Sequence, residues 1–73
     1  MFEAAIKRID DRQARCRVLI STDTLSEAER TLSGYLSLYY GNVPVVLRYT
    51  DGLNYIIYID GIYYGSVEIV LTD

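Results

Sequence analysis

The side chains that carry most protein chemistry are almost missing from this sequence. Its 73 residues include no His and one Cys, Cys16. Without His there is no Ser–His or Cys–His pair for nucleophilic catalysis, and one Cys supplies neither a disulfide within the sequence nor a zinc site of thiolates and imidazoles. We therefore expect no enzymatic activity, no cofactor and no bound metal.

Four aspartates invite comparison with a cation site. Asp10 and Asp11 are adjacent, and Asp51 and Asp60 each precede a glycine. Asp at such positions favours tight turns because its carboxylate bonds the nearby backbone, and the ligand spacing of an EF-hand calcium loop is absent. We interpret all four as turn residues. We interpret Cys16 as a core residue, because it lies at an apolar position of an alternating segment and a reactive thiol needs an exposed setting.

Charge and hydropathy narrow the classes of function. The net charge is −3, with ten acidic and seven basic residues, and they form no run typical of a nucleic-acid-binding tail. A transmembrane helix needs an apolar stretch of about 18 residues, and no stretch here is that long. The first residues lack the basic and apolar regions of a signal peptide. With a free thiol, these features predict a small acidic protein of the cytoplasm that contacts no membrane.

The clearest predicted element is a helix within the segment TDTLSEAERTLSGYLSLYYGN. Either Thr24 with Glu27 or Ser26 with Glu29 would form a capping box at its start, and Gly41 would end it. Its apolar residues recur at helical spacing and are expected to face the core: Leu25, Ala28, Leu32, Tyr35, Leu36 and Tyr39.

Three strands are expected after the helix, separated by two Asp-Gly turns. A two-residue loop at the second turn would direct polar side chains of the last strand toward the core. We therefore predict three-residue loops, which pair Tyr49 with Leu53 and Tyr58 with Ile62. One face of the three strands is then apolar, with Val45, Leu47, Tyr49, Leu53, Tyr55, Ile57, Ile59, Tyr63, Gly65, Val67, Ile69 and Leu71.

The N-terminal segment has two interpretations. Residues 14–22 alternate between apolar and polar positions and predict a strand, whereas residues 2–9 fit both a strand and a helix. We favour a hairpin with its loop at residues 10–13. The predicted fold is one α+β domain, residues 1–73, with an antiparallel sheet of four to five strands and one helix packed on one face. Its element order is β-β-α-β-β-β, with α-β-α-β-β-β as the alternative.

The predicted sheet leaves apolar and tyrosine side chains on the face away from the helix. An antiparallel sheet with a solvated face normally places polar residues there, and a contiguous apolar patch indicates a binding surface. Val46, Ile56 and Tyr64 are expected to lie side by side across the three strands. The predicted protein-binding interface comprises Val46, Arg48, Ile56, Tyr58, Ile62 and Tyr64.

Four interpretations of this face stay open. In the first, these residues occur on this face only because they favour strands, and they bind nothing. A second copy of the chain covers them. A larger protein binds them, through the Tyr and Arg that are enriched at interfaces. Nucleic acid binds them, with tyrosines stacking on bases and Arg15, Arg17 and Arg48 near phosphates. A rival surface for self-association lies on the small residues of the helix around Gly34.

The size of the chain favours association. Burial of apolar surface stabilises a fold of this mass by roughly 110 kcal/mol, and ordering its residues costs about 110 kcal/mol. We therefore predict a non-catalytic protein–protein interaction module that forms a homodimer, binds a larger protein, or both. Phage- or virus-encoded inhibitors and adaptors that bind a host protein belong to this class. A nucleic-acid-binding sheet and a structural subunit of an assembly are the alternatives.

Overall fold

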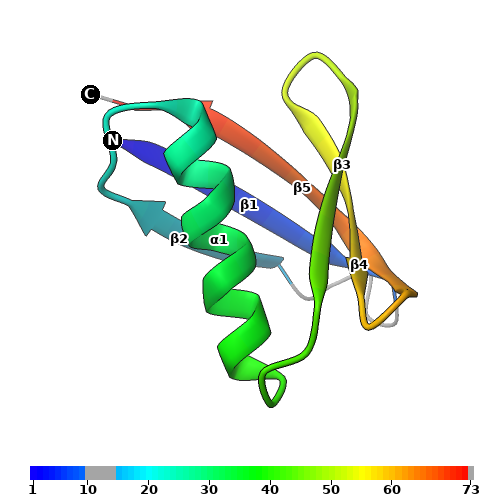
Figure 1. The fold of residues 1–73 in the computed structure, drawn as a ribbon. Coiled ribbons are helices and arrows are strands. Elements are labelled where there is room, and N and C mark those ends of the chain that lie inside the picture. Colours follow the sequence, from blue (N-terminus) through cyan, green and yellow to red (C-terminus); the bar gives the residue numbers. More distant parts are fainter. Residues whose placement is uncertain (10–14, 73) are drawn as a thin grey trace.

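The computed structural model describes residues 1–9 and 15–72, which form five strands and one helix (Figure 1). The predicted loop at residues 10–13 lies outside the described residues. The elements in chain order are β1 Phe2–Arg8, β2 Arg15–Ile20, α1 Leu25–Tyr39, β3 Val45–Asp51, β4 Asn54–Ile59 and β5 Ile62–Leu71.

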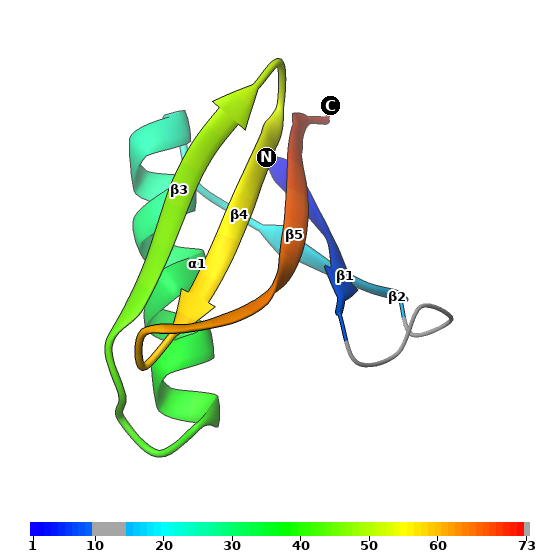
Figure 2. The ribbon, with the colours of Figure 1, turned by 90° about the vertical axis from the view of Figure 1, so that its right-hand side faces the viewer.

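All five strands pair antiparallel in one sheet with the spatial order β2-β1-β5-β4-β3. The helix α1 covers one face of this sheet (Figure 1). The sheet is strongly twisted, so that β1 and β2 run across the direction of β3 and β4 (Figure 2). The predicted α+β class and the order β-β-α-β-β-β are confirmed. Among the described residues, no helix is long and apolar enough to cross a membrane.

β1 is a strand because its apolar residues alternate with period two. Phe2, Ala4 and Ile6 are buried, which is the spacing of one face of a strand. β1 also has a strand on each side, since β2 and β5 both pair with it. The helical alternative for residues 2–9 would also have buried Ile9, which is 53% exposed. That alternative is wrong.

Local hydrogen bonds define both ends of α1. The Glu27 N–H donates to the Thr24 hydroxyl oxygen at 3.2 Å, so the first of the two predicted caps is the one that forms. At the other end, the N–H groups of Gly41 and Asn42 donate to carbonyl oxygens of the last turn at 3.3 and 2.7 Å. Gly41 has a left-handed φ of 88°. This pattern is a Schellman motif, and it ends the helix where the sequence predicts.

Half of the predicted inner stripe of α1 is buried. The buried residues are Ala28, Leu32 and Leu36. The exposed residues are Leu25, Tyr35 and Tyr39. The helix therefore contacts the sheet along a stripe narrower than its apolar face. The prediction that all six residues face the core is wrong for the three outer ones.

The second hairpin turn is tighter than predicted. Ile59 pairs with Ile62 and Tyr58 with Tyr63, so the loop between β4 and β5 has two residues. The φ angles of these residues, Asp60 and Gly61, are 53° and 79°, as a type I′ turn requires. The predicted pair of Tyr58 with Ile62 is wrong.

A β-bulge in β5 then restores the predicted inner face. The partner of Tyr58 is Tyr63, whereas the partner of the preceding residue, Ile57, is Gly65. Tyr64 is the extra residue between them, and an extra residue reverses the alternation of faces. Beyond the bulge, Gly65, Val67 and Ile69 are buried on the predicted inner face. The predicted inner position of Tyr63 is wrong, because Tyr63 lies before the bulge and pairs with Tyr58 on the outer face.

The first turn follows the same plan. Asp51 pairs with Asn54 across a two-residue loop, and Tyr49 pairs with Tyr55, which makes Thr50 the extra residue. The predicted pairing of Tyr49 with Leu53 is therefore shifted by two positions. A shift of two keeps each side chain on its face, so the predicted inner faces of β3 and β4 remain correct.

The core lies between α1 and the inner face of the sheet. Its buried residues come from β1, β2, α1, β4 and β5: Phe2, Ala4, Ile6, Ile20, Ala28, Leu32, Leu36, Tyr55, Ile57, Val67 and Ile69. Among the described residues, no buried side chain is polar apart from the tyrosine hydroxyl. That hydroxyl, on Tyr55, donates to the Glu29 carboxylate at 2.6 Å.

This hydrogen bond predicts a loss of stability in alkali. Burial, and then the bond to Glu29, raises the pKa of Tyr55 from 10.0 to about 12. Above pH 10 the unfolded chain loses this proton while the folded chain keeps it, so the free energy of unfolding falls between pH 10 and about 12. Urea unfolding at several pH values should show a shallower fall for Tyr55→Phe than for the wild type. Parallel curves for the two proteins would contradict the assignment.

Candidate protein-binding surfaces

The face of the sheet turned away from α1 carries tyrosine and aliphatic side chains at its β3–β4–β5 end. The register places Val46, Tyr58 and Tyr63 in one row across the strands. The ring centroids of Tyr58 and Tyr63 are 6.1 Å apart, and Val46 and Tyr63 are 57% and 48% exposed. Arg48 and Ile56 form the adjacent pair. We call these five residues the outer patch.

The structure places four of the six predicted interface residues in the outer patch: Val46, Arg48, Ile56 and Tyr58. Tyr64 lies on the other face and packs against the core, because it is the extra residue of the bulge. Ile62 pairs with Ile59, whose side chain packs against the core, although Ile62 itself is 70% exposed. The predicted row of Val46, Ile56 and Tyr64 is therefore wrong, and Tyr63 takes the place predicted for Tyr64.

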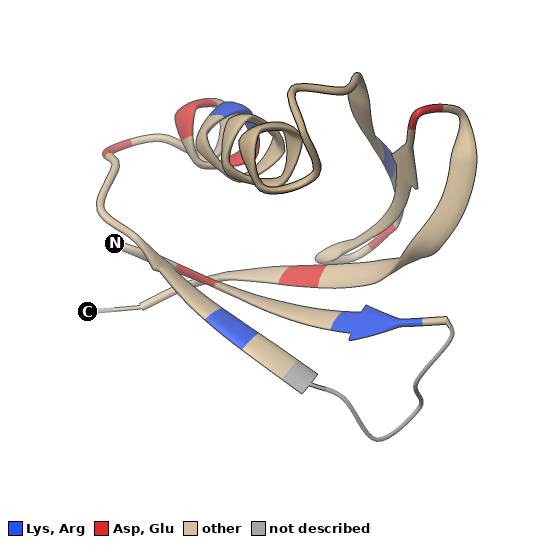
Figure 3. Ribbon diagram, turned by 90° about the horizontal axis from the view of Figure 1, so that it is seen from below, with Lys and Arg blue, Asp and Glu red and all other residues tan. Residues whose placement is uncertain are grey.

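Beyond the outer patch this face of the sheet mixes polar and apolar side chains, and Leu19, opposite Glu3 in the register, is 66% exposed. Arg17 on β2 and Glu3 on β1 form an ion pair with 3.0 Å between nitrogen and oxygen, and Glu68 on β5 is exposed. Acidic and basic segments are interspersed over the sheet and the helix (Figure 3). Among the described residues, the tyrosine rings of this face lie at its β3–β4–β5 end.

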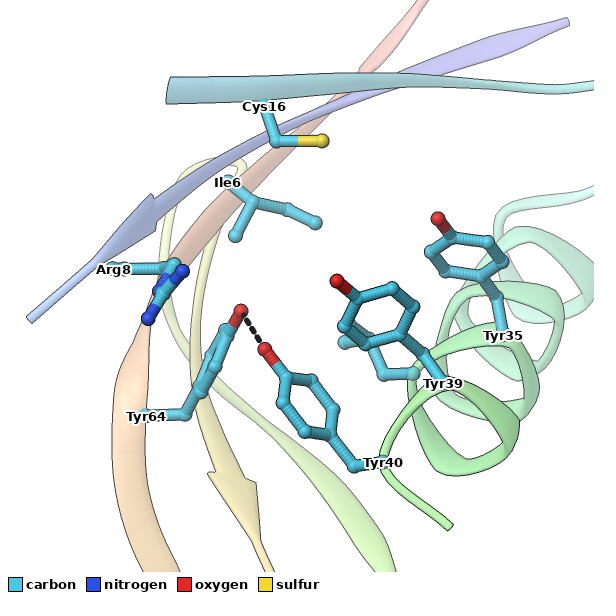
Figure 4. Close-up of a pocket in the computed structure, with 8 residues that line it drawn as sticks. Ile6, Arg8, Cys16, Tyr35, Tyr39, Tyr40 and Tyr64 are labelled. Atoms are coloured by element: carbon cyan, nitrogen blue, oxygen red, sulfur yellow. Dashed lines mark hydrogen bonds between the residues drawn. The ribbon is translucent and has the colours of Figure 1, made fainter. Parts of the chain in front are cut away.

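A second surface, which the sequence analysis missed, is a cleft between α1 and the sheet, with a volume of about 250 Å³ (Figure 4). Tyrosines dominate its lining because Tyr35 and Tyr39 lie in the last part of α1, Tyr40 follows directly, and the bulge of β5 turns Tyr64 toward them. We call it the tyrosine cleft. The residues that define it are Arg8, Cys16, Tyr35, Tyr39, Tyr40 and Tyr64.

The rings of the tyrosine cleft contact one another in series. Tyr39 and Tyr40 meet edge to face with centroids 4.8 Å apart, and Tyr40 and Tyr64 meet in the same way at 5.5 Å, a favourable geometry for aromatic pairs. The hydroxyls of Tyr40 and Tyr64 share a hydrogen bond of 2.7 Å (Figure 4). The guanidinium carbon of Arg8 lies 5.8 Å from the centre of the Tyr64 ring, within the range of a cation–π contact.

Cys16 corrects another prediction. Its thiol is exposed and opens onto the tyrosine cleft, although it stands on the inner face of β2 as predicted. Further along the same face, Val18 packs against the core and Ile20 is buried. Cys16 is left uncovered because β2 is an edge strand, so the core thins out beside it.

Both surfaces consist mainly of aromatic and aliphatic side chains, with one Arg in each. Among the described residues, no three His, Cys, Asp or Glu side chains lie close enough to hold a metal ion. The described lining of the tyrosine cleft contains no carboxylate. What both surfaces offer a partner is ring faces, aliphatic groups and guanidinium groups, which are enriched where proteins bind other molecules.

A scan of the chain against protein-family models finds no match, and searches of curated proteins and of solved structures find none either.

Proposed function

We propose that this protein is a protein–protein interaction module and that a second copy of the chain docks on the outer patch. The observation that carries the proposal is the Tyr58–Tyr63 ring pair beside Val46, on the face that α1 does not cover. On a solvated sheet face these positions are normally polar. Here they hold aromatic and aliphatic side chains with one Arg, the composition found at the centre of interfaces.

The outer patch is an exposed apolar surface on a small domain, and Val46 and Tyr63 are 57% and 48% exposed. A second copy is the preferred occupant because most oligomers are symmetric assemblies of one chain. In a two-fold dimer the same patch faces itself, so that tyrosine rings from both copies pack together.

Other parts of the sequence-based prediction stay predictions. A larger protein would use the same outer patch, and its binding would appear as an interaction that competes with dimer formation. The cytoplasm is the compartment that suits a free, exposed Cys16. The phage or viral origin rests on size and composition alone.

Paired substitutions test the proposed dimer. Val46→Lys with Tyr63→Glu places charges at the centre of the outer patch and is expected to abolish the concentration-dependent increase in mass seen by sedimentation velocity. Both side chains are exposed, so the fold should survive. The matched control is Leu38→Glu on α1, which is 75% exposed and should leave the dimer intact. Loss of the dimer with the control alone would place self-association on the helix instead.

A further inference from the structure

β2 is an edge strand of the described sheet. The register identifies which of its backbone N–H and C=O groups point away from β1. The Ile9 N–H donates to Tyr64, and the Thr72 N–H donates to Met1. In the β1–β5 register, these two bonds lie at odd-numbered positions on the β1 side. Because backbone groups point alternately to the two sides of an antiparallel strand, the N–H and C=O groups of the odd-numbered residues of β1 bond to β5. The even-numbered residues of β1 therefore bond to β2.

The same alternation sets the direction of the backbone in β2. Even residues of β1 pair with even residues of β2, as in Ala4 with Val18. The N–H and C=O groups of the odd residues, Arg17 and Leu19 among them, therefore point away from β1. In the described part of the chain no strand lies beyond β2, and Leu19 is 66% exposed. An edge of this kind is a template for another strand.

The core is also incomplete along this edge. On the helix side of β2, Cys16 is exposed, and across the tyrosine cleft from it Tyr35 and Tyr39 are 49% and 69% exposed. Figure 4 shows Cys16 on its strand facing the same space as these rings. A strand added beside β2 would direct every second side chain into this space, and those side chains would cover what α1 and β2 leave open.

We propose that β2 binds an extended segment of another protein by strand addition, with apolar residues that alternate with acidic ones. The apolar residues enter the tyrosine cleft, and the backbone bonds to the odd residues of β2 supply affinity, as in other complexes formed by β-augmentation. The acidic residues fall on the opposite face of the sheet. The side chains of Arg17 and Lys7 are exposed there.

Charge selects this partner over a second copy of β2. On the face of the sheet away from α1, Arg17 of β2 and Lys7 of β1 are exposed. A second copy of β2 would bring another Arg17 to this edge, and like charges on neighbouring strands destabilise a sheet. Glutamates of an added strand would be attracted to Lys7 and to Arg17, which already pairs with Glu3. This site is separate from the outer patch, so the inference does not depend on the proposed dimer.

The test uses a fluorescently labelled synthetic peptide that alternates Glu with Val or Ile, and measures its anisotropy on titration with the full chain. Saturable binding is expected, at least about tenfold tighter than for the same peptide with Lys in place of Glu. Leu19→Pro removes one outward N–H and is tolerated at an edge strand, and it should weaken binding by about tenfold or more. Leu19→Ala keeps that N–H and should bind like the wild type.

Two further variants report on the cleft. Tyr39→Ala should weaken binding, whereas Leu38→Ala, at a neighbouring exposed position outside the cleft, should not. Absence of saturable binding, or equal affinity for Leu19→Pro and the wild type, would overturn the proposal. Binding that is abolished by Val46→Lys with Tyr63→Glu would also overturn the proposal, because the peptide would then lie on the outer patch. In that case the proposed protein-binding function would stand without the β2 site.

Discussion

Replacing Gly65 by alanine should lower the free energy of unfolding by about 3 kcal/mol, the upper range for forcing extra volume into a packed site. A Cβ at this position would collide with the carbonyl oxygen of Lys7 and lie 3.0 Å from the Cα of Arg8. Both are backbone atoms of β1, so no side-chain rotation relieves the contact. The site is on the central strand of the sheet, beside the bulge, where Gly65 pairs with Arg8 of β1.

A second glycine supplies the control for this prediction. Gly34 lies within α1, and a Cβ there would meet no atom within 4 Å. Gly34→Ala should therefore raise the free energy of unfolding by about 0.5–1 kcal/mol, the gain in helix propensity. Urea unfolding measures both variants. Equal stabilities for Gly65→Ala and the wild type would mean that β1 and β5 do not approach as described.

Leu32→Ala should cost about 2–5 kcal/mol, the range for a buried leucine whose cavity does not collapse. Leu32 has no exposed surface and is one of the largest fully buried side chains among the described residues. It lies between its helical neighbours Ala28 and Leu36, so its removal would empty the middle of the contact between α1 and the sheet.

The matched substitution is Leu38→Ala, on the same helix but 75% exposed. It should change the free energy of unfolding by less than about 0.5 kcal/mol, as expected of a surface position. Chemical denaturation of the two variants under one set of conditions gives the comparison. Similar costs for Leu32→Ala and Leu38→Ala would contradict the described orientation of α1.

The sequence predicted the order of elements because each element has a strong periodic pattern. Ala28, Leu32 and Leu36 mark the inner side of the helix, and Thr24 and Gly41 its ends. The alternation in β3 and β4 identified their inner faces, even though the pairings were shifted by two residues. A period of two is insensitive to such a shift, so the faces were predictable where the register was not.

The turns were mispredicted because the extra residue was placed in each loop, whereas the structure places it inside a strand, at Thr50 and at Tyr64. A two-residue loop at Asp60 and Gly61 was set aside on the ground that it would bring polar residues to the core. The extra residue, Tyr64, removes that difficulty. An isolated glycine within a strand is a signal for a bulge or a close backbone approach, and Gly65 directly after Tyr64 was such a signal. Recognising it would have placed Tyr63, in place of Tyr64, in the outer patch.

The tyrosine cleft could not be predicted from the sequence, for a different reason. Periodicity shows which side of α1 is apolar, but it does not show how much of that side the sheet covers. Tyr35 and Tyr39 extend past the contact, and Cys16 is uncovered because β2 has a neighbour on one side in the described sheet. Strand order decides both outcomes, and strand order depends on contacts between distant parts of the chain.

Amide NMR spectra over a dilution series show whether a second copy of the chain covers the outer patch. At about 100 μM even an interface with a dissociation constant of about 10 μM is mostly occupied. We expect concentration-dependent shifts centred on Val46, Ile56, Tyr58 and Tyr63, with little change along α1. Spectra and line widths of a monomer at every concentration, or shifts confined to α1, would contradict the proposed dimer.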